Sequence, residues 1–223
     1  MNACLSPCFC RLLSVCLVAP AFSTAPAQQL VPLRDTWRYI DDGANRYGGT
    51  LPFSEPAYND SAWKSGQARL GYGGDGEATV ILFGPSSGSK YITAYLRKEF
   101  TWDGVTPPGA DVLLMEFTRD DGAMVYLNGE LVDNSNMTGG TVNSSTRALT
   151  AVSGADEWRL YQREVRLPLL QPGRNVIAVG LHQNAPDSSD LGFDLRLELG
   201  RRHLFFSQST LLAPPHGISS LLG

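Results

Sequence analysis

The stretch Met124-Val125-Tyr126-Leu127-Asn128-Gly129-Glu130-Leu131-Val132 decides the fold class of this chain. Two apolar runs flank an Asn-Gly pair, and this pair tolerates positive φ at both central positions of a tight turn. Because such a turn has the same twist as the strands that it joins, the stretch predicts a β-hairpin. No run of a dozen residues keeps apolar side chains at helical spacing without an intervening Gly or Pro. We therefore expect strands rather than helices.

Further strand signals lie on both sides of the hairpin. Asp120-Asp121-Gly122 separates the hairpin from the preceding apolar run, which predicts a second turn and a three-strand meander. Loops rich in small and polar residues are expected at 71–76 and 138–155. Apolar or alternating runs without helices between them predict an all-β fold, an antiparallel β-sandwich. The runs that predict these further strands are 94–102, 111–118, 161–169, 174–182 and 193–199.

Charge, length and cysteine positions exclude several classes of protein. The chain has 223 residues with 18 basic and 22 acidic side chains, so its net charge is −4. This charge argues against a nucleic-acid partner, because such proteins are normally basic. The length suits one domain of roughly 150–200 residues with a sizeable core. The cysteines permit no disulfide scaffold, thiolate zinc site or cysteine nucleophile in the later chain, because they are confined to Cys4, Cys8, Cys10 and Cys16.

Residues 1–27 have the pattern of a secretory signal peptide. Arg11 precedes an apolar run that is too short to span a bilayer, and Ala25-Pro26-Ala27 is a small-residue cleavage signature. We expect a mature chain that starts at Gln28 and is secreted, either outside the cell or into the periplasm. No membrane insertion is expected after cleavage. The alternatives are a lipoprotein processed at Cys16, a wrongly assigned start codon and a buried apolar strand.

Several short segments occur in a recognisable order along the chain: Trp63-Lys64-Ser65-Gly66 with Leu70-Gly71-Tyr72-Gly73, then 95–100, 120–129, 175–179 and 188–194. In this order they resemble the galactose-binding-domain-like jelly-roll module of secreted bacterial multidomain proteins. The resemblance implies a jelly-roll β-sandwich at 28–200, followed by a tail or linker stub at 201–223. It also implies a non-catalytic module, which in this family often lies beside a metallophosphoesterase or glycoside hydrolase domain.

Acidic residues at two places are candidate metal ligands. Asp120 and Asp121 are adjacent, and paired carboxylates beside backbone carbonyls suit Ca²⁺, which prefers six to eight oxygens. Asp190 belongs to a second acidic group with Asp187 and Asp194. The sequence thus predicts a structural calcium ion with Asp120, Asp121 and Asp190 among its ligands. The alternative for the first pair is a turn in which one carboxylate accepts backbone N–H groups. The alternative for the second group is a set of solvated turn carboxylates.

Four residues are candidates for contact with a ligand. Tyr72 is flanked by glycines and Trp158 follows the long polar loop, so both rings are expected to be exposed. An exposed ring can stack on the apolar face of a sugar. His182 and Asn184 follow a buried-type strand and enter a loop, where their polar tips suit hydrogen bonds to sugar hydroxyls. A structural role in the core is the alternative for each, and a zinc site at this lone histidine is not expected.

Three functional hypotheses remain open. The first is a secreted, non-catalytic module that binds carbohydrate or another cell-surface polymer. The second is a structural accessory domain of a truncated multidomain hydrolase, such as a metallophosphoesterase, that packs against its catalytic neighbour and binds no ligand. The third is a glycosidase that uses Asp120 or Asp121. It is disfavoured because adjacent residues on a tight turn seldom flank a substrate from opposite sides. We therefore expect no catalytic residue in this chain.

Overall fold

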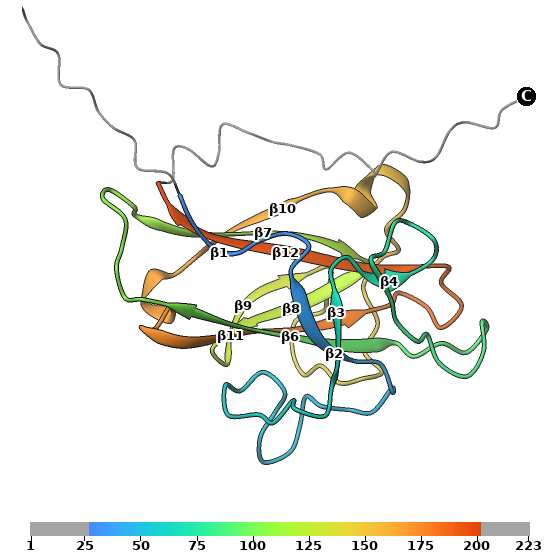
Figure 1. Ribbon diagram of the computed structural model, residues 1–223. Helices are drawn as coiled ribbons and strands as arrows, with labels where there is room; N and C mark the ends of the chain where they lie inside the picture. The colour runs from blue at the N-terminus through green and yellow to red at the C-terminus, as the bar shows by residue number, and fades with distance from the viewer. Residues whose placement is uncertain (1–26, 202–223) are drawn as a thin grey trace, which may run out of the picture.

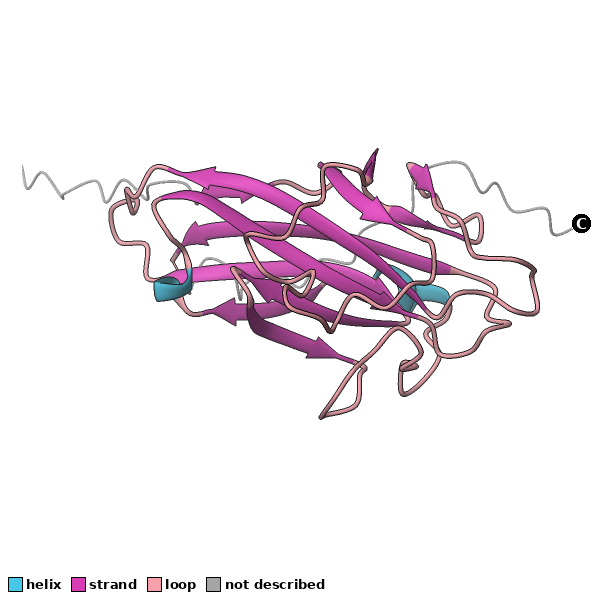
Figure 2. Ribbon diagram, turned by 90° about the horizontal axis from the view of Figure 1, so that it is seen from below, coloured by secondary structure: helices cyan, strands magenta, loops and turns pink. Residues whose placement is uncertain are grey.

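The computed structural model describes residues 27–201 of the chain. The predicted signal peptide (1–27) and the predicted tail (201–223) lie outside the described residues, except for Ala27 and Arg201. Twelve strands in the described part form two sheets, which lie face to face as two layers (Figure 1). Two short 3-10 helical turns, η1 (Gly154–Trp158) and η2 (Leu167–Leu169), lie at opposite ends of the sandwich (Figure 2). Among the described residues, no helix is long and apolar enough to cross a membrane.

Sheet A is built around β12, which pairs with β7 along one edge. The other edge of β12 pairs with β4 near its start and with β1 near its end. Every pair in this sheet is antiparallel except that of β4 with β5. The strand order is β10 (Tyr161–Val165), β7 (Val112–Asp120), β12 (Leu191–Gly200), β4 (Leu70–Tyr72) and β5 (Thr79–Val80), with β1 (Gln28–Val31) beside β12.

Sheet B is antiparallel throughout and is built around β6 and β11. These two strands pair over their full ten-residue lengths, from Gly173 opposite Trp102 to His182 opposite Thr93. The strand order is β3 (Lys64–Gln67), β2 (Thr36–Ile40), β6 (Thr93–Trp102), β11 (Gly173–His182), β8 (Gly122–Leu127) and β9 (Glu130–Ser135). The two sheets together confirm the predicted all-β antiparallel sandwich.

The main core lies between the two sheets. Alternate residues of each strand point inward, so β12 contributes Phe193, Leu195 and Leu197, none of which is more than 1% exposed. Trp37 of β2 is also fully buried, and its ring meets that of Phe193 edge-on with the ring centroids 5.9 Å apart. Large aromatic side chains bury much apolar surface, so a well-filled interior can stabilise the sandwich without covalent cross-links.

The outer face of sheet B is covered by two long loop segments rather than by solvent. Residues 41–63 lie below β2 and β6 in Figure 1 and place Phe53 against the sheet. Residues 136–150 place Met137, Val142 and Ala148 against β8 and form a further apolar cluster. The second segment therefore differs from its prediction as a surface loop, because part of it is buried. Its polar composition conceals these few apolar anchors.

Two predictions about local structure are wrong in detail. The turn at Asp121 does not continue a meander, because β7 belongs to sheet A and β8 to sheet B. The chain therefore crosses between the layers at this point, and only the hairpin of β8 and β9 around Asn128-Gly129 is confirmed. The strand predicted at 161–169 ends at Val165, after which η2 contains Pro168. Proline lacks an N–H group to continue the strand pairing.

Candidate functional site

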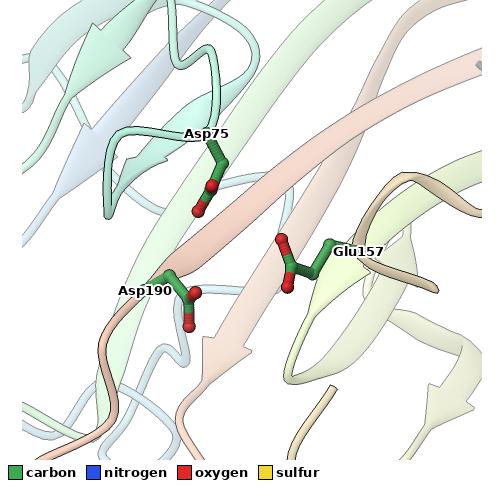
Figure 3. A group of neighbouring side chains, drawn as sticks. All are labelled: Asp75, Glu157 and Asp190. Atoms are coloured by element: carbon green, nitrogen blue, oxygen red, sulfur yellow. The ribbon is translucent and has the colours of Figure 1, made fainter. Parts of the chain in front are cut away.

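Three carboxylates from separate segments converge at one end of sheet A (Figure 3). Asp75 lies in the loop between β4 and β5, Glu157 lies in η1, and Asp190 directly precedes β12. One carboxylate oxygen from each residue lies within 4.8 Å of the other two. This spacing is about twice the Ca–O distance of 2.3–2.6 Å, so one ion between the three side chains could contact all of them.

Asp120, the last residue of β7, adds a fourth carboxylate to this end of the sheet. It is fully buried, and within the described residues neither of its carboxylate oxygens has a hydrogen-bond partner. Burial, followed by the charges of Asp121 and Asp190, raises the pKa of Asp120 to about 9. Burial and neighbouring carboxylates also raise the pKa values of Asp75 and Glu157. We refer to Asp75, Asp120, Glu157 and Asp190 as the acidic end.

Arg69 is a buried cation beside the acidic end. Its guanidinium lies directly against Gly192 of β12. A Cβ atom added at Gly192 would clash with this guanidinium. The ring of Trp158 covers the guanidinium at 4.7 Å from Cζ to the ring centroid. Nη1 donates to the backbone carbonyl of Glu157 at 2.8 Å, whereas Nε and Nη2 have no partner among the described residues. The carboxylates thus outnumber the cation that lies among them.

A small cavity of about 40 Å³ adjoins Arg69 and Trp158. On its wall, Asp194 accepts the backbone N–H of Arg34 with both carboxylate oxygens at 3.1 Å, and burial raises the pKa of Asp194 to about 6. The hydroxyl of Thr118 also lines the cavity and has no partner in the described chain. The space suits about three water molecules and is too small for a sugar ring.

Asp121, the neighbour of Asp120, differs from the acidic end because both of its carboxylate oxygens already accept hydrogen bonds. Its two carboxylate oxygens accept the backbone N–H groups of Val152 at 2.6 Å and Asn184 at 2.8 Å. Its own carbonyl accepts from Arg119 at 2.6 Å and from Asn136 at 3.0 Å. Asp121 therefore ties the turn between the sheets to two loops, as the alternative reading of this pair expects. Of the other two predicted metal ligands, Asp190 is one of the three converging carboxylates, and Asp120 lies close enough for the charge of Asp190 to raise its pKa.

The predicted ligand-binding residues lie in different places and differ in exposure. Tyr72 is 5% exposed, so the prediction that its ring is exposed is wrong: its hydroxyl accepts from Gln183, and burial raises its pKa to about 12. Trp158 is half-buried over Arg69. Asn184 is half-buried, and its side-chain amide donates to the carbonyl of Ala148 at 3.2 Å.

His182 is fully buried under the loop segment 41–63. Its Nε2 lies 2.5 Å from the hydroxyl of Tyr47, and its Nδ1 lies 2.7 Å from the carbonyl oxygen of Thr146 and 3.0 Å from the hydroxyl of Thr93. Burial lowers the pKa of His182 to about 4, so the ring is neutral at pH 7. These contacts join both covering loops to the sheet, and they give His182 a structural role.

Asp75, Glu157 and Arg69 belong to the site, but they are not among the residues that the sequence predicts for it. The glycines around Asp75, in Gly73-Gly74-Asp75-Gly76, are a usable signal, because they indicate a turn that can bring a carboxylate close to a backbone. Glu157 and Arg69 carry no such signal in their neighbours. Asp187 and Asp194, which were grouped with Asp190, do not join the three converging carboxylates.

The fold is shared with parts of bacterial glycoside hydrolases. A glycosyl hydrolase family 2 member from Bacteroides cellulosilyticus matches 78% of this chain and 21% of its own, with 13% identity and a TM-score of 0.50. Bacteroides uniformis beta-glucuronidase 2 matches 78% and 18%, with 17% identity and a TM-score of 0.48. A calcium binding mutant of that enzyme gives the same coverage, with 15% identity and a TM-score of 0.46.

The likeness to the Bacteroides cellulosilyticus protein, at a TM-score of 0.50, shows the fold alone. The chain spans about a fifth of the length of the solved structures that it resembles. No protein-family model matches the chain, and no curated protein matches it in sequence.

Proposed function

We propose that this chain is a secreted, non-catalytic β-sandwich module of the galactose-binding-like type, which binds carbohydrate or another surface polymer and is stabilised by Ca²⁺ at its acidic end. The observation that carries the metal proposal is the convergence of three carboxylates beside a buried carboxyl group that has no hydrogen-bond partner among the described residues. Asp75, Glu157 and Asp190 bring three oxygens together, and the buried Asp120 beside them has none of its hydrogen-bonding needs met. Ionising a buried carboxyl group that has no partner is costly, and a bound cation would offset that cost.

The chemistry of these donors favours Ca²⁺ over a transition metal. All of the groups are carboxylate oxygens, which suit hard cations, whereas zinc sites usually contain histidine or cysteine. The ligands come from a loop, a 3-10 turn and the ends of two strands rather than from one continuous segment, and Ca²⁺ accepts such irregular geometry better than Mg²⁺ does. Asp120, Asp190, Asp75 and Glu157 therefore form the proposed ligand set. Asp121, a predicted ligand, is left out because backbone N–H groups already occupy both of its oxygens.

The proposed ion would act as a cross-link. It would join the β4–β5 loop, η1 and the start of β12, which are far apart in sequence. A module that is exported and has no cysteine after residue 16 can use such a tie in place of a disulfide. Modules that work outside the cell bind Ca²⁺ with dissociation constants of about 10⁻⁴–10⁻³ M, so a site of modest affinity would suffice.

The non-catalytic part of the proposal rests on the state of the acidic residues. A glycosidase needs two carboxyl groups on opposite sides of a cleft that admits a sugar. Asp120 and Asp121 are both fully buried, and the cavity beside the acidic end holds only about three waters. Neither residue can reach a glycosidic bond in this arrangement.

A second candidate function is that of an accessory domain in a longer hydrolase. It is favoured by one observation: the chain spans about a fifth of the glycoside hydrolase structures whose fold it shares. On this reading the module packs against an adjacent catalytic domain, and its acidic end has only a structural purpose. Both candidate functions are compatible with the same calcium site, and they differ in whether the module binds a sugar itself.

Thermal unfolding with added metal tests the calcium site. At a concentration one hundred times its dissociation constant, Ca²⁺ stabilises a protein by about 2.7 kcal/mol. For a domain of this size we expect the melting temperature to rise by about 5–10 °C, and EDTA to reverse the rise. Mg²⁺ at the same concentration is the control and should have a much smaller effect.

Two variants localise the effect to the acidic end. Asp190→Asn should remove most of the calcium-dependent rise in melting temperature, because it removes one of the converging carboxylates. Asp187→Asn is the matched control, since Asp187 is an exposed residue of the same loop. Equal melting temperatures in Ca²⁺ and in EDTA for the unaltered chain would overturn the calcium proposal.

A further inference from the structure

A second site lies at the boundary between sheet B and the loop that follows β5. It is an open cleft with a volume of about 410 Å³, which falls within the range of small-molecule sites. We call it the Tyr91 cleft. Its walls come from the end of β2, the start of β3 and the loop between β5 and β6, and they include Asp41, Asp42, Lys64, Leu82, Pro85 and Tyr91.

Asp41 fixes the shape of the cleft. It is only 3% exposed, and its Oδ1 accepts from Nζ of Lys64 at 2.6 Å while its Oδ2 accepts the backbone N–H of Leu82 at 2.7 Å. One buried carboxylate therefore holds together the three segments that form the walls. Because these bonds are internal to the chain, the cleft is formed before any ligand arrives, which lowers the entropy cost of binding.

Tyr91 is seated in a slot made by two glycines. Gly43 has a φ of 73° and Gly84 a φ of 119°, and a Cβ atom at either would crowd the Tyr91 ring. The backbone N–H of Tyr91 donates to the carbonyl of Phe83 at 2.7 Å. The ring is half-buried, so part of it remains available on the wall of the cleft. A fixed and partly exposed ring is a suitable platform for an apolar ring face.

The charges in the cleft are balanced pair by pair. Asp41 is paired with Lys64, and Asp42 accepts from both terminal nitrogens of Arg46 at 2.7 Å. An ionic ligand would therefore have to displace an existing partner, whereas a neutral one need not. Lys64 has three N–H donors, and a carboxylate such as Asp42 has about four acceptor positions, so both keep capacity for further hydrogen bonds.

We infer that the Tyr91 cleft binds a neutral sugar ring. Such a ring offers an apolar C–H face to Tyr91, Leu82 and Pro85, and hydroxyl groups that can both donate and accept at Asp42 and Lys64. This inference rests on the proposed function as a carbohydrate module and adds the place of the site and the class of sugar. The ligand-contact residues proposed here replace Tyr72 and His182, which the sequence predicts but which are both buried.

The test measures the binding of neutral and acidic oligosaccharides to the full chain in the presence of Ca²⁺, by isothermal titration calorimetry. The probes are gluco-, galacto-, manno- and xylo-oligosaccharides, with oligogalacturonate as the acidic comparison. We expect at least one neutral probe to bind and oligogalacturonate to bind more weakly. Tyr91→Ala should weaken that binding about tenfold or more, whereas Tyr91→Phe, which keeps the ring, should bind within a few-fold of the unaltered chain.

Trp158→Ala separates this cleft from the aromatic platform predicted by the sequence. We expect it to leave sugar binding unchanged. Loss of binding in Trp158→Ala but not in Tyr91→Ala would overturn the inference, as would preference for the acidic probe. Absence of binding by every neutral probe would also overturn it, and the exposed Val80 and Leu82 beside the cleft would then favour a protein-docking surface.

The calcium measurement keeps the two proposals apart. Tyr91→Ala should retain the full rise in melting temperature with Ca²⁺, which also shows that the variant is folded. If Ca²⁺ stabilises the chain while no neutral sugar binds, the cleft assignment fails and the calcium site stands. If a sugar binds at Tyr91 without any stabilisation by Ca²⁺, the calcium proposal fails and the cleft assignment stands.

Discussion

The acidic end and the Tyr91 cleft both contain aspartate side chains, but these differ in whether they have hydrogen-bond partners. In the cleft, Asp41 and Asp42 each have a basic partner, and the buried Asp41 uses both of its oxygens. At the acidic end, Asp120 is equally buried and uses neither oxygen. The difference shows that burial alone does not leave a carboxyl group without hydrogen-bond partners. What distinguishes the acidic end is an excess of carboxylate oxygens over hydrogen-bond donors.

The largest expected effect comes from breaking the support of the acidic end. A Cβ atom at Gly71 of β4 would overlap the backbone carbonyl of Leu191, so Gly71→Ala must part β4 from β12. We expect a loss of about 3 kcal/mol or more in the free energy of unfolding. Urea denaturation measures this loss. Gly88→Ala, in an open loop beside the cleft, is the control and should change stability by less than about 0.5 kcal/mol.

Neutralising one carboxylate in each region should change stability in opposite directions. Asp41→Asn removes the charged partner of Lys64, and we expect it to cost about 1.5–3 kcal/mol. Asp190→Asn in EDTA relieves repulsion among the acidic residues, and we expect a gain on the order of 1 kcal/mol. Urea denaturation of both variants in EDTA checks this. A destabilising Asp190→Asn under those conditions would contradict the description of the acidic end as a site of repulsion between carboxylates.

The sequence predicts the sandwich well because short-range residue patterns determine where its strands and turns form. The Asn128-Gly129 turn and the alternating residues of β12 act within a few positions, and both predictions are confirmed. The meander is wrong because a turn signal at Asp121 does not reveal which sheet the next strand joins. That choice depends on long-range pairing with β11 and β12, which no local pattern encodes.

The acidic end is only partly predictable for the same reason. Asp120 and Asp190 could be proposed because they stand in acidic groups along the chain. Asp75 and Glu157 are 82 residues apart in the sequence. They come together only because β4 pairs with β12 and η1 packs against β7. The burial of Tyr72 is not predictable from its neighbours either. Its flanking glycines indicate a loop, whereas in the structure Tyr72 ends a buried strand.

The pH dependence of stability should also separate the two regions. Burial raises the pKa of Asp120 to about 9, so folding favours its protonated form. The resulting stabilisation is fully present below the unfolded value of 3.8 and is lost as the pH rises through about 9. In EDTA, we expect stability to fall with rising pH by at most about 1.4 kcal/mol per pH unit from this group. Urea denaturation between pH 5 and about 8 measures the slope.

Asp120→Asn is the variant that assigns this slope. It should flatten the fall in stability because it removes the titrating group, whereas Asp42→Asn in the cleft should not. The pKa of Asp42 is lowered by its hydrogen bonds with Arg46, so its titration lies below this pH range. An unchanged slope in Asp120→Asn would contradict the assignment.

The smallest expected effect concerns charges that belong to neither region. Glu99 accepts from Arg174 at 2.6 Å, but their side chains are 60% and 48% exposed. Water screens such a pair, so Glu99→Gln should change the free energy of unfolding by less than about 0.5 kcal/mol. Urea denaturation checks this as well. A cost comparable to that of Asp41→Asn would mean that burial does not explain the difference between the paired sites.

Calorimetric titration of Ca²⁺ into the metal-free full chain at pH 7 is the most direct test of the calcium site. The account predicts binding of one Ca²⁺ per chain, weakened strongly in Glu157→Gln and unchanged in Asp187→Asn. Glutamine can still accept the N–H of Gly154, so the first variant removes the charge and keeps this hydrogen bond. Absence of binding by the unaltered chain, or equal binding by Glu157→Gln, would contradict the account.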